Sequence, residues 1–117
     1  MSYVDGYIVP VPIARFEEYR ALAEKGAAIW KELGAISVLE ARADDAPVGE
    51  LTSFPRSVMA KEDETVVFSY ITYRDRAHRD EVTAAAMKHQ GFIALMNNPP
   101  FDGKRMIWGG FAPFVTA

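Results

Sequence analysis

The clearest strand signal in this chain is the run Thr65-Val66-Val67-Phe68-Ser69-Tyr70-Ile71-Thr72-Tyr73, in which β-branched and aromatic residues are dense. Alternate residues of a strand point to opposite faces of a sheet. One face of this strand carries Val66, Phe68 and Tyr70, and the other carries Val67, Ile71 and Tyr73. Helices on one side of the sheet can cover only one of these apolar faces. We therefore expect a second copy of the chain to cover the other face; the alternative is that its aromatic side chains lie on a solvated surface.

The rest of the chain supplies the partners of this strand. Hydrophobic spacing and turn residues predict further strands over residues 3–12, 35–43, 52–60 and 105–115, and helices over residues 14–33, 76–89 and 92–96. Pro55 makes the 52–60 strand weak, typical of an edge or a bulge. Gly34 ends the first helix and Asp75 caps the second. The order is interpreted as strand, helix, strand, strand, helix, strand, which predicts an α+β, ferredoxin-like fold with an antiparallel sheet and both helices on one face.

Length and composition limit the classes of protein. A chain of 117 residues has room for one domain, residues 1–117. With 13 basic and 16 acidic residues the net charge is −3, which argues against a nucleic-acid partner. The chain has no cysteine, and this excludes disulfides, thiolate metal sites and cysteine nucleophiles. It has no signal peptide and no apolar run of about 18 residues, so we expect a cytoplasmic protein without a membrane span.

Four separated motifs resemble a known family. They are YVDGYIVPVP at residues 3–12, TSFPRSV at 52–58, RAHRD at 76–80, and PFDGKRM at 100–106 followed by GGF at 109–111. Together they resemble the YbaA-like family of small bacterial proteins of unknown function, over essentially the whole chain. The resemblance implies a dimeric α/β-barrel, in which the sheets of two ferredoxin-like protomers pack together. That superfamily includes cofactor-independent monooxygenases, haem-using enzymes and lactone isomerases, but this branch has no assigned reaction.

Two histidines are candidates for chemistry. His78 and His89 lie on one stripe of the predicted helix, roughly 16 Å apart at ~1.5 Å per residue, too far to share a metal ion. His78 is the better candidate for a catalytic base, because the start of a helix favours the neutral imidazole. The alternative is a partly buried histidine bonded to the backbone or to Asp75. Haem ligation by either histidine has no other support, and we expect neither a metal nor a cofactor.

The candidate cations are arginines. Arg56 either points to solvent or is held against an anion or a carboxylate. Asp102-Gly103-Lys104-Arg105 is typical of a tight turn, and its side chains are also candidates for ligand capture. Arg79 and the adjacent Asp80 are interpreted as a solvated surface pair unless the structure buries them.

The function predicted from these residues is that of a homodimer which binds a small apolar or aromatic molecule between its sheet and its helices. Tyr7, Tyr70 and Trp108 are expected to line the pocket, with Asp102 and Lys104 as further ligand contacts; the alternative for the aromatic residues is core or interface packing. If the protein is an enzyme, His78 abstracts a proton while Arg56 or Arg105 stabilises the oxyanion, and the resemblance implies a cofactor-independent monooxygenase or isomerase. The competing hypothesis is a non-catalytic dimeric binding or interaction module. Motifs of α/β-hydrolases, Rossmann folds, P-loops and zincins are absent.

Overall fold

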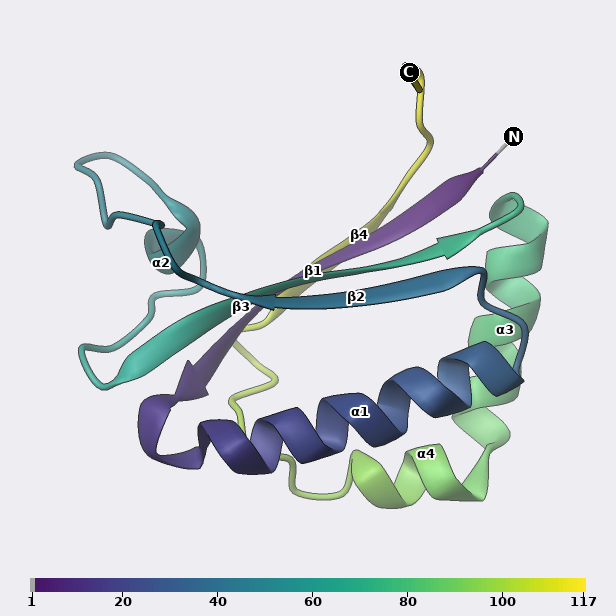
Figure 1. Ribbon diagram of the computed structural model, residues 1–117, viewed down its shortest axis with the longest axis horizontal. Coiled ribbons are helices and arrows are strands. Elements are labelled where there is room, and N and C mark those ends of the chain that lie inside the picture. The colour runs from purple at the N-terminus through teal and green to yellow at the C-terminus, as the bar shows by residue number, and fades with distance from the viewer. Residues whose placement is uncertain (1) are drawn as a thin grey trace.

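The computed structural model describes residues 2–117, which form one four-stranded antiparallel sheet and a layer of helices (Figure 1). The elements in chain order are β1 (Tyr3–Pro12), a 3-10 helix (Ile13–Arg15), α1 (Phe16–Glu32), β2 (Ser37–Arg42), α2 (Phe54–Ser57), β3 (Glu64–Tyr73), α3 (Arg76–Lys88), α4 (Gln90–Leu95) and β4 (Ile107–Phe111). The strands are ordered β2-β3-β1-β4, with β1 and β3 in the centre. This order confirms the predicted α+β, ferredoxin-like fold.

The central pair of strands places alternate residues on opposite faces of the sheet. β1 and β3 pair in register from Tyr3 opposite Tyr73 to Pro12 opposite Glu64. Figure 1 shows α1, α3 and α4 on one side of the sheet, and we call this side the helix face. Most of the core lies under these helices, where Val67, Ile71 and Tyr73 of β3 are at most 5% exposed. A smaller buried cluster of Ile8, Val66 and Val58 lies on the other side of the sheet, next to α2.

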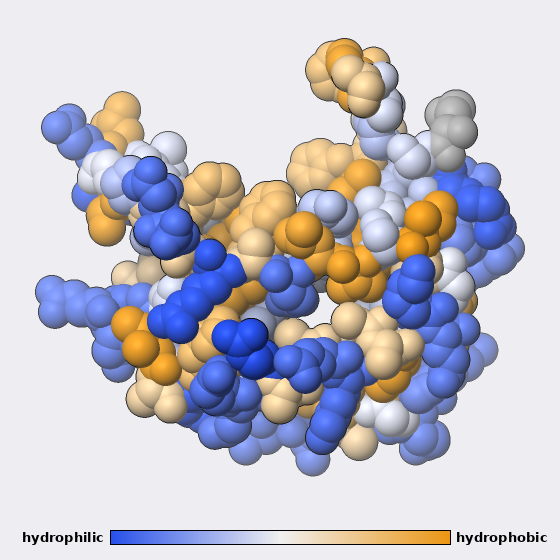
Figure 2. All heavy atoms as spheres, in the orientation of Figure 1, coloured by the Kyte–Doolittle hydropathy of each residue, from blue (hydrophilic) through white to orange (hydrophobic). Residues whose placement is uncertain are grey.

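The opposite side of the sheet, which we call the outer face, carries apolar side chains that remain exposed. Leu39, Phe68, Ile107 and Phe111 are each between 37% and 65% exposed. Figure 2 shows apolar side chains in the hollow above the sheet, between the loop that carries α2 and the C-terminal segment. Within the single chain, the prediction of an apolar strand on both of its faces is therefore confirmed.

The ends of two helices follow the predicted signals. Gly34 follows α1 with a φ of +116°, a backbone angle that glycine adopts without strain. Asp75 caps α3, because its Oδ1 accepts a hydrogen bond from the His78 N–H at 2.8 Å. Helix α1 begins at Phe16, after a separate 3-10 turn, so the predicted start at Ala14 is two residues early.

The prediction of a strand over residues 52–60 is wrong, because this segment contains the short helix α2. Ser53 caps the helix by accepting a hydrogen bond from the Arg56 N–H at 3.1 Å. Pro55 lies in the first helical turn, where the missing N–H is not needed. The proline that weakened the strand prediction is therefore a helix-start residue.

The C-terminal boundaries also differ from the prediction. Helix α3 ends at Lys88, and His89 has extended backbone angles, so the two histidines do not share one continuous helix. The last strand covers Ile107–Phe111 rather than residues 105–115, because Arg105 is in a turn and residues 112–117 leave the sheet (Figure 1). Phe114, in that final segment, is 97% exposed.

Candidate functional site

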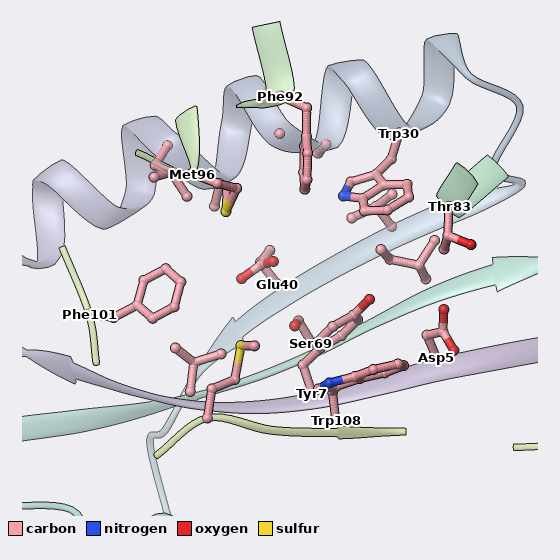
Figure 3. Close-up of a pocket in the computed structure, with 18 of the residues that line it drawn as sticks. Asp5, Tyr7, Trp30, Glu40, Ser69, Thr83, Phe92, Met96, Phe101 and Trp108 are labelled. Carbon is pink, nitrogen blue, oxygen red and sulfur yellow. The ribbon is translucent and has the colours of Figure 1, made fainter. Parts of the chain in front are cut away.

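A cavity of about 590 Å³ lies between the helix face of the sheet and the three helices (Figure 3). Strand positions that point to the helix face supply its floor, including Tyr7 of β1, Glu40 of β2 and Ser69 of β3. Its other walls come from α1, α3, α4 and residues 101–108. Most of the lining is apolar, and aromatic and methionine side chains provide much of it: Trp30, Phe92, Met96, Phe101, Met106 and Trp108.

The cavity exists because α1 presents small residues to the sheet. The side of α1 that lines the cavity carries Ala23, Gly26 and Ala27. A Cβ atom added to Gly26 would meet nothing within 4 Å. Larger residues at these positions would extend into the space between α1 and the sheet. The amphipathic helix predicted from the sequence is thus also the wall that leaves room for a ligand.

Aromatic pairs form the sides of the cavity. Tyr7 and Trp108 are stacked with ring centroids 6.4 Å apart and an interplanar angle of 22°. On the opposite side, the ring of Trp30 meets that of Phe92 edge to face at 5.2 Å. Such walls suit a flat, apolar molecule.

The position of Phe92 depends on His89, which lies between α3 and α4. The His89 Nδ1 atom accepts a hydrogen bond from the Phe92 N–H at 3.2 Å, and its Nε2 is 2.9 Å from Oε2 of Glu32 on α1. His89 therefore caps α4 and connects it to α1.

Residues 2–117 contain no group of three or more histidine, aspartate or glutamate side chains placed to hold a metal ion.

Glu40 is a carboxylate in the middle of the cavity (Figure 3). The Tyr19 hydroxyl, from α1, donates a hydrogen bond to its Oε1 atom at 2.8 Å. Glu40 is exposed, but the cavity walls partly desolvate its carboxylate and so raise its pKa, while the hydroxyls of Tyr19 and Ser69 act in the opposite direction. Burial likewise raises the pKa of Tyr19 and that of Tyr7.

A second carboxyl group lies under one end of the cavity. Asp5 has no exposed surface, and neither of its oxygens has a hydrogen-bond partner among residues 2–117. The Arg79 Nε atom is 3.7 Å from Asp5 Oδ1, and the Tyr73 hydroxyl is close enough to lower the pKa of Asp5. Burial is nevertheless the larger influence, so the pKa of Asp5 is raised.

Arg79 and Asp80 were expected to form a solvated surface pair unless the structure buries them, and the structure largely buries Arg79. Its side chain is 13% exposed and its Nη2 atom donates a hydrogen bond to the Tyr3 hydroxyl at 3.1 Å. Asp80, in contrast, keeps 55% of its side chain exposed and lies 3.5 Å from the Arg79 Nε atom. Arg79 therefore links α3 to β1, at the end of the cavity that contains Asp5.

His78 is buried and lies outside the set of residues that line the cavity. Its Nδ1 atom accepts a hydrogen bond from the Arg74 N–H at 3.0 Å, and its ring packs edge to face on Tyr73 at 5.9 Å. The geometry matches the alternative weighed from the sequence, a histidine bonded to the backbone. It connects the end of β3 to the start of α3.

The two arginines of the predicted oxyanion site also make contacts within the chain. Arg56 donates from Nε to the Val48 carbonyl and from Nη2 to the Gly49 carbonyl, both at 2.9 Å, and so closes the loop before α2. Arg105 forms a two-pronged ion pair with Glu64, at 2.8 and 2.7 Å, and a further pair with Asp102 at 2.8 Å. Neither arginine lines the cavity.

Of the five predicted ligand contacts, Tyr7 and Trp108 line the cavity. Tyr70 points to the outer face, where its ring is 6.4 Å from that of Phe68. Asp102 accepts a hydrogen bond from the backbone N–H of Lys104 at 3.0 Å, which makes this segment a tight turn outside the cavity. The structure thus brings together one aromatic pair of the predicted set and does not bring His78, Arg56 or Arg105 to it.

One family model and one curated relative each match most of this chain. The family described as "Protein of unknown function (DUF1428)" matches residues 2–103. The uncharacterized protein YbaA of Escherichia coli is 42% identical over 115 residues, which cover 98% of each chain. None of the described helices is both long enough and apolar enough to cross a membrane.

Two solved structures are similar in fold at low sequence identity. SnoaB, described as a cofactor-independent oxygenase from Streptomyces nogalater, has a TM-score of 0.63 and 14% identity, covering 98% of this chain and 95% of its own. A dimeric ferredoxin-like protein from an uncultured marine organism has a TM-score of 0.64 and 13% identity, covering all of both chains. At these identities the similarity concerns the fold alone.

Proposed function

This chain belongs to the family of proteins of unknown function DUF1428, with YbaA among its relatives, and we propose that it binds a small apolar or aromatic molecule between its sheet and its helices. The observation that carries this proposal is the cavity of about 590 Å³, which has aromatic walls and few polar groups. Cavities of this size and character are typical of small-molecule sites. Tyr7 and Trp108 are the proposed ligand contacts that the sequence also predicts.

The binding proposal is tested with a neutral fluorescent probe, N-phenyl-1-naphthylamine. Gly26→Leu places an isobutyl group in the cavity, because the Cβ direction at this position is open. Gly26→Ala is the matched control, since it keeps most of the space. We expect the wild type and Gly26→Ala to bind the probe and Gly26→Leu to bind it at least tenfold more weakly. Equal binding by all three proteins would place the probe elsewhere, for example on the outer face, and would refute the proposal.

We also propose that two copies of the chain pack together through the outer face. Exposed side chains of three strands, Leu39, Phe68, Ile107 and Phe111, form an apolar surface there, and Phe54 of α2 extends it with its ring 6.2 Å from that of Phe68. Neighbouring exposed apolar side chains of this kind are typical of association sites. The similarity in fold to a protein described as dimeric and ferredoxin-like supports the same arrangement.

A second candidate function is cofactor-independent catalysis, of the monooxygenase or isomerase type. The similarity in fold to SnoaB supports it, as do the Glu40 and Asp5 carboxyl groups at the cavity. The contacts that engage His78, Arg56 and Arg105 favour the alternative, a non-catalytic binding module, and we propose structural roles for these three residues. The cytoplasmic location and the absence of a nucleic-acid partner, a metal or a cofactor stay predictions.

A further inference from the structure

Glu40 differs from the other carboxyl groups at the cavity in being reachable and free of a cation. Asp5 has no exposed surface, and Asp80 lies 3.5 Å from Arg79. Glu40 is exposed, and no lysine, arginine or histidine among residues 2–117 lies within ion-pair distance of it. Among the carboxyl groups that line the cavity it is therefore the one that is both accessible and free of a cation.

The carboxylate of Glu40 is held in place by Tyr19. Oε1 accepts the hydrogen bond from the Tyr19 hydroxyl at 2.8 Å, and Tyr19 is itself 5% exposed with its ring edge to face on Phe101 at 5.8 Å. This hydrogen bond fixes Oε1, and the Ser69 hydroxyl lies near enough to act on the pKa of Glu40 as well. A carboxylate has about four acceptor positions, so Glu40 can still accept a hydrogen bond from a further donor. Figure 3 shows the carboxylate pointing into the cavity, with Ser69 beside it and with the aromatic side chains around it.

The charged and titratable groups around Glu40 do not neutralise it. Those that line the cavity are Tyr19, Tyr7, Asp5, Arg79 and Asp80, and those around the adjoining hollow are Arg20, Glu24 and Arg42. The guanidinium of Arg42 stacks on Phe16 at 4.2 Å, Arg20 pairs with Glu17 at 3.0 Å, and Arg79 lies between Asp5 and Asp80. An anionic ligand would meet a wall in which acidic groups outnumber basic ones.

We propose that Glu40 selects the ligand of this cavity, by accepting a hydrogen bond from an uncharged aromatic molecule that carries an O–H or N–H donor, such as a phenol or an aromatic amine. The inference rests on the proposed function, because it requires the cavity to hold an aromatic molecule. Aromatic walls bind the ring, and the remaining acceptor positions of the Glu40 carboxylate fix its orientation. The competing ligand class is a small organic cation, which the carboxylate and the aromatic walls would also attract, and a cationic probe in the experiment separates the two.

The inference is tested with three probes of similar shape: 4-nitrophenol, which has the donor; 4-nitroanisole, in which a methyl group replaces the donor hydrogen; and benzyltrimethylammonium, which is cationic. Their affinities are measured by calorimetry for the wild type, for Glu40→Gln, and for Glu81→Gln, which changes an exposed carboxylate of α3 outside the cavity. We expect the wild type and Glu81→Gln to bind 4-nitrophenol at least about tenfold more tightly than 4-nitroanisole. In Glu40→Gln this preference should fall several-fold.

The absorption spectrum of bound 4-nitrophenol gives a second readout, because its neutral and anionic forms absorb at different wavelengths. Next to the Glu40 carboxylate the probe should keep its proton to a higher pH than it does in Glu40→Gln. The same titration in both proteins, equal binding of the two neutral probes, or tighter binding of the cation would overturn the inference while leaving the proposed function standing. If the wild type binds neither neutral probe nor N-phenyl-1-naphthylamine, the proposed function fails with it.

Discussion

Replacing Gly26 by alanine should stabilise the protein, although the residue is buried in the middle of α1. Its backbone is that of an ordinary right-handed helix, since only Gly34 and Gly49 among the described glycines have positive φ. An added Cβ would meet nothing within 4 Å, so the methyl group causes no clash. Alanine is favoured over glycine inside a helix by about 1 kcal/mol.

The expected gain for Gly26→Ala is therefore about 1 kcal/mol in the free energy of unfolding, mostly from the smaller backbone entropy of the unfolded chain. For a chain of this length it corresponds to a rise of roughly 4 °C in Tm. Burial of the methyl group adds little, because the group enters a cavity rather than a packed core.

Urea unfolding followed by circular dichroism measures this gain, and the slope m should not change. Gly34→Ala is the control, because its φ of +116° requires the opposite sign, a loss of about 1 kcal/mol or more. If Gly26→Ala lowers the free energy of unfolding, the space beside α1 is not open and the cavity itself is in doubt.

Four further predictions concern other parts of the molecule. Asp75→Ala removes the cap of α3 and should lower the free energy of unfolding by about 1 kcal/mol in urea titration. Phe68→Glu puts a charge in the outer face, so light scattering should show the mass of two chains for the wild type and one for the variant; equal masses would refute the proposed dimer. The Arg105 guanidinium holds the pKa of Glu64 below its ordinary value of 4.5, so the stability contributed by this pair should be lost as pH falls below 4.5, and Glu64→Gln should flatten that acid limb. Burial raises the pKa of Asp5 above its ordinary 3.8, so ionisation opposes folding as pH rises above 3.8, and Asp5→Asn should gain stability relative to the wild type at neutral pH; a loss there would show that the ion pair with arginine dominates.

Strand periodicity and helix ends predict the fold because they depend on local chemistry. The apolar run at residues 65–73, Gly34 and Asp75 each have the structural role that their residue types indicate. The segment at residues 52–60 was misassigned because proline is compatible with two local structures, an edge strand and the first turn of a helix. The residue that distinguishes the two structures is Ser53, because a serine just before the proline segment can cap the start of a helix, as it does here for α2.

The candidate site was harder to predict, because it depends on which polar side chains the tertiary structure buries. His78 and the arginines have the chemistry of catalytic groups, yet their partners are backbone carbonyls, a backbone N–H and carboxylates brought close by the fold. Asp5 and Glu40 were missed. The sequence does contain a signal for them, because each carboxylate shares a strand face with apolar residues. Asp5 lies on the same face as Tyr7 and Val9, and Glu40 on the same face as Val38.

Each strand supplies residues to both faces of the sheet, at alternating positions. In β3, even-numbered residues from Val66 to Tyr70 reach the outer face, and odd-numbered ones from Val67 to Ile71 reach the helix face. A point substitution in β3 can therefore alter the cavity side without altering the outer face, so the proposed ligand site and the proposed dimer surface can change independently. Loss or gain of one codon within the strand would exchange both surfaces at once, so such indels should be purged from the strands and confined to the loops.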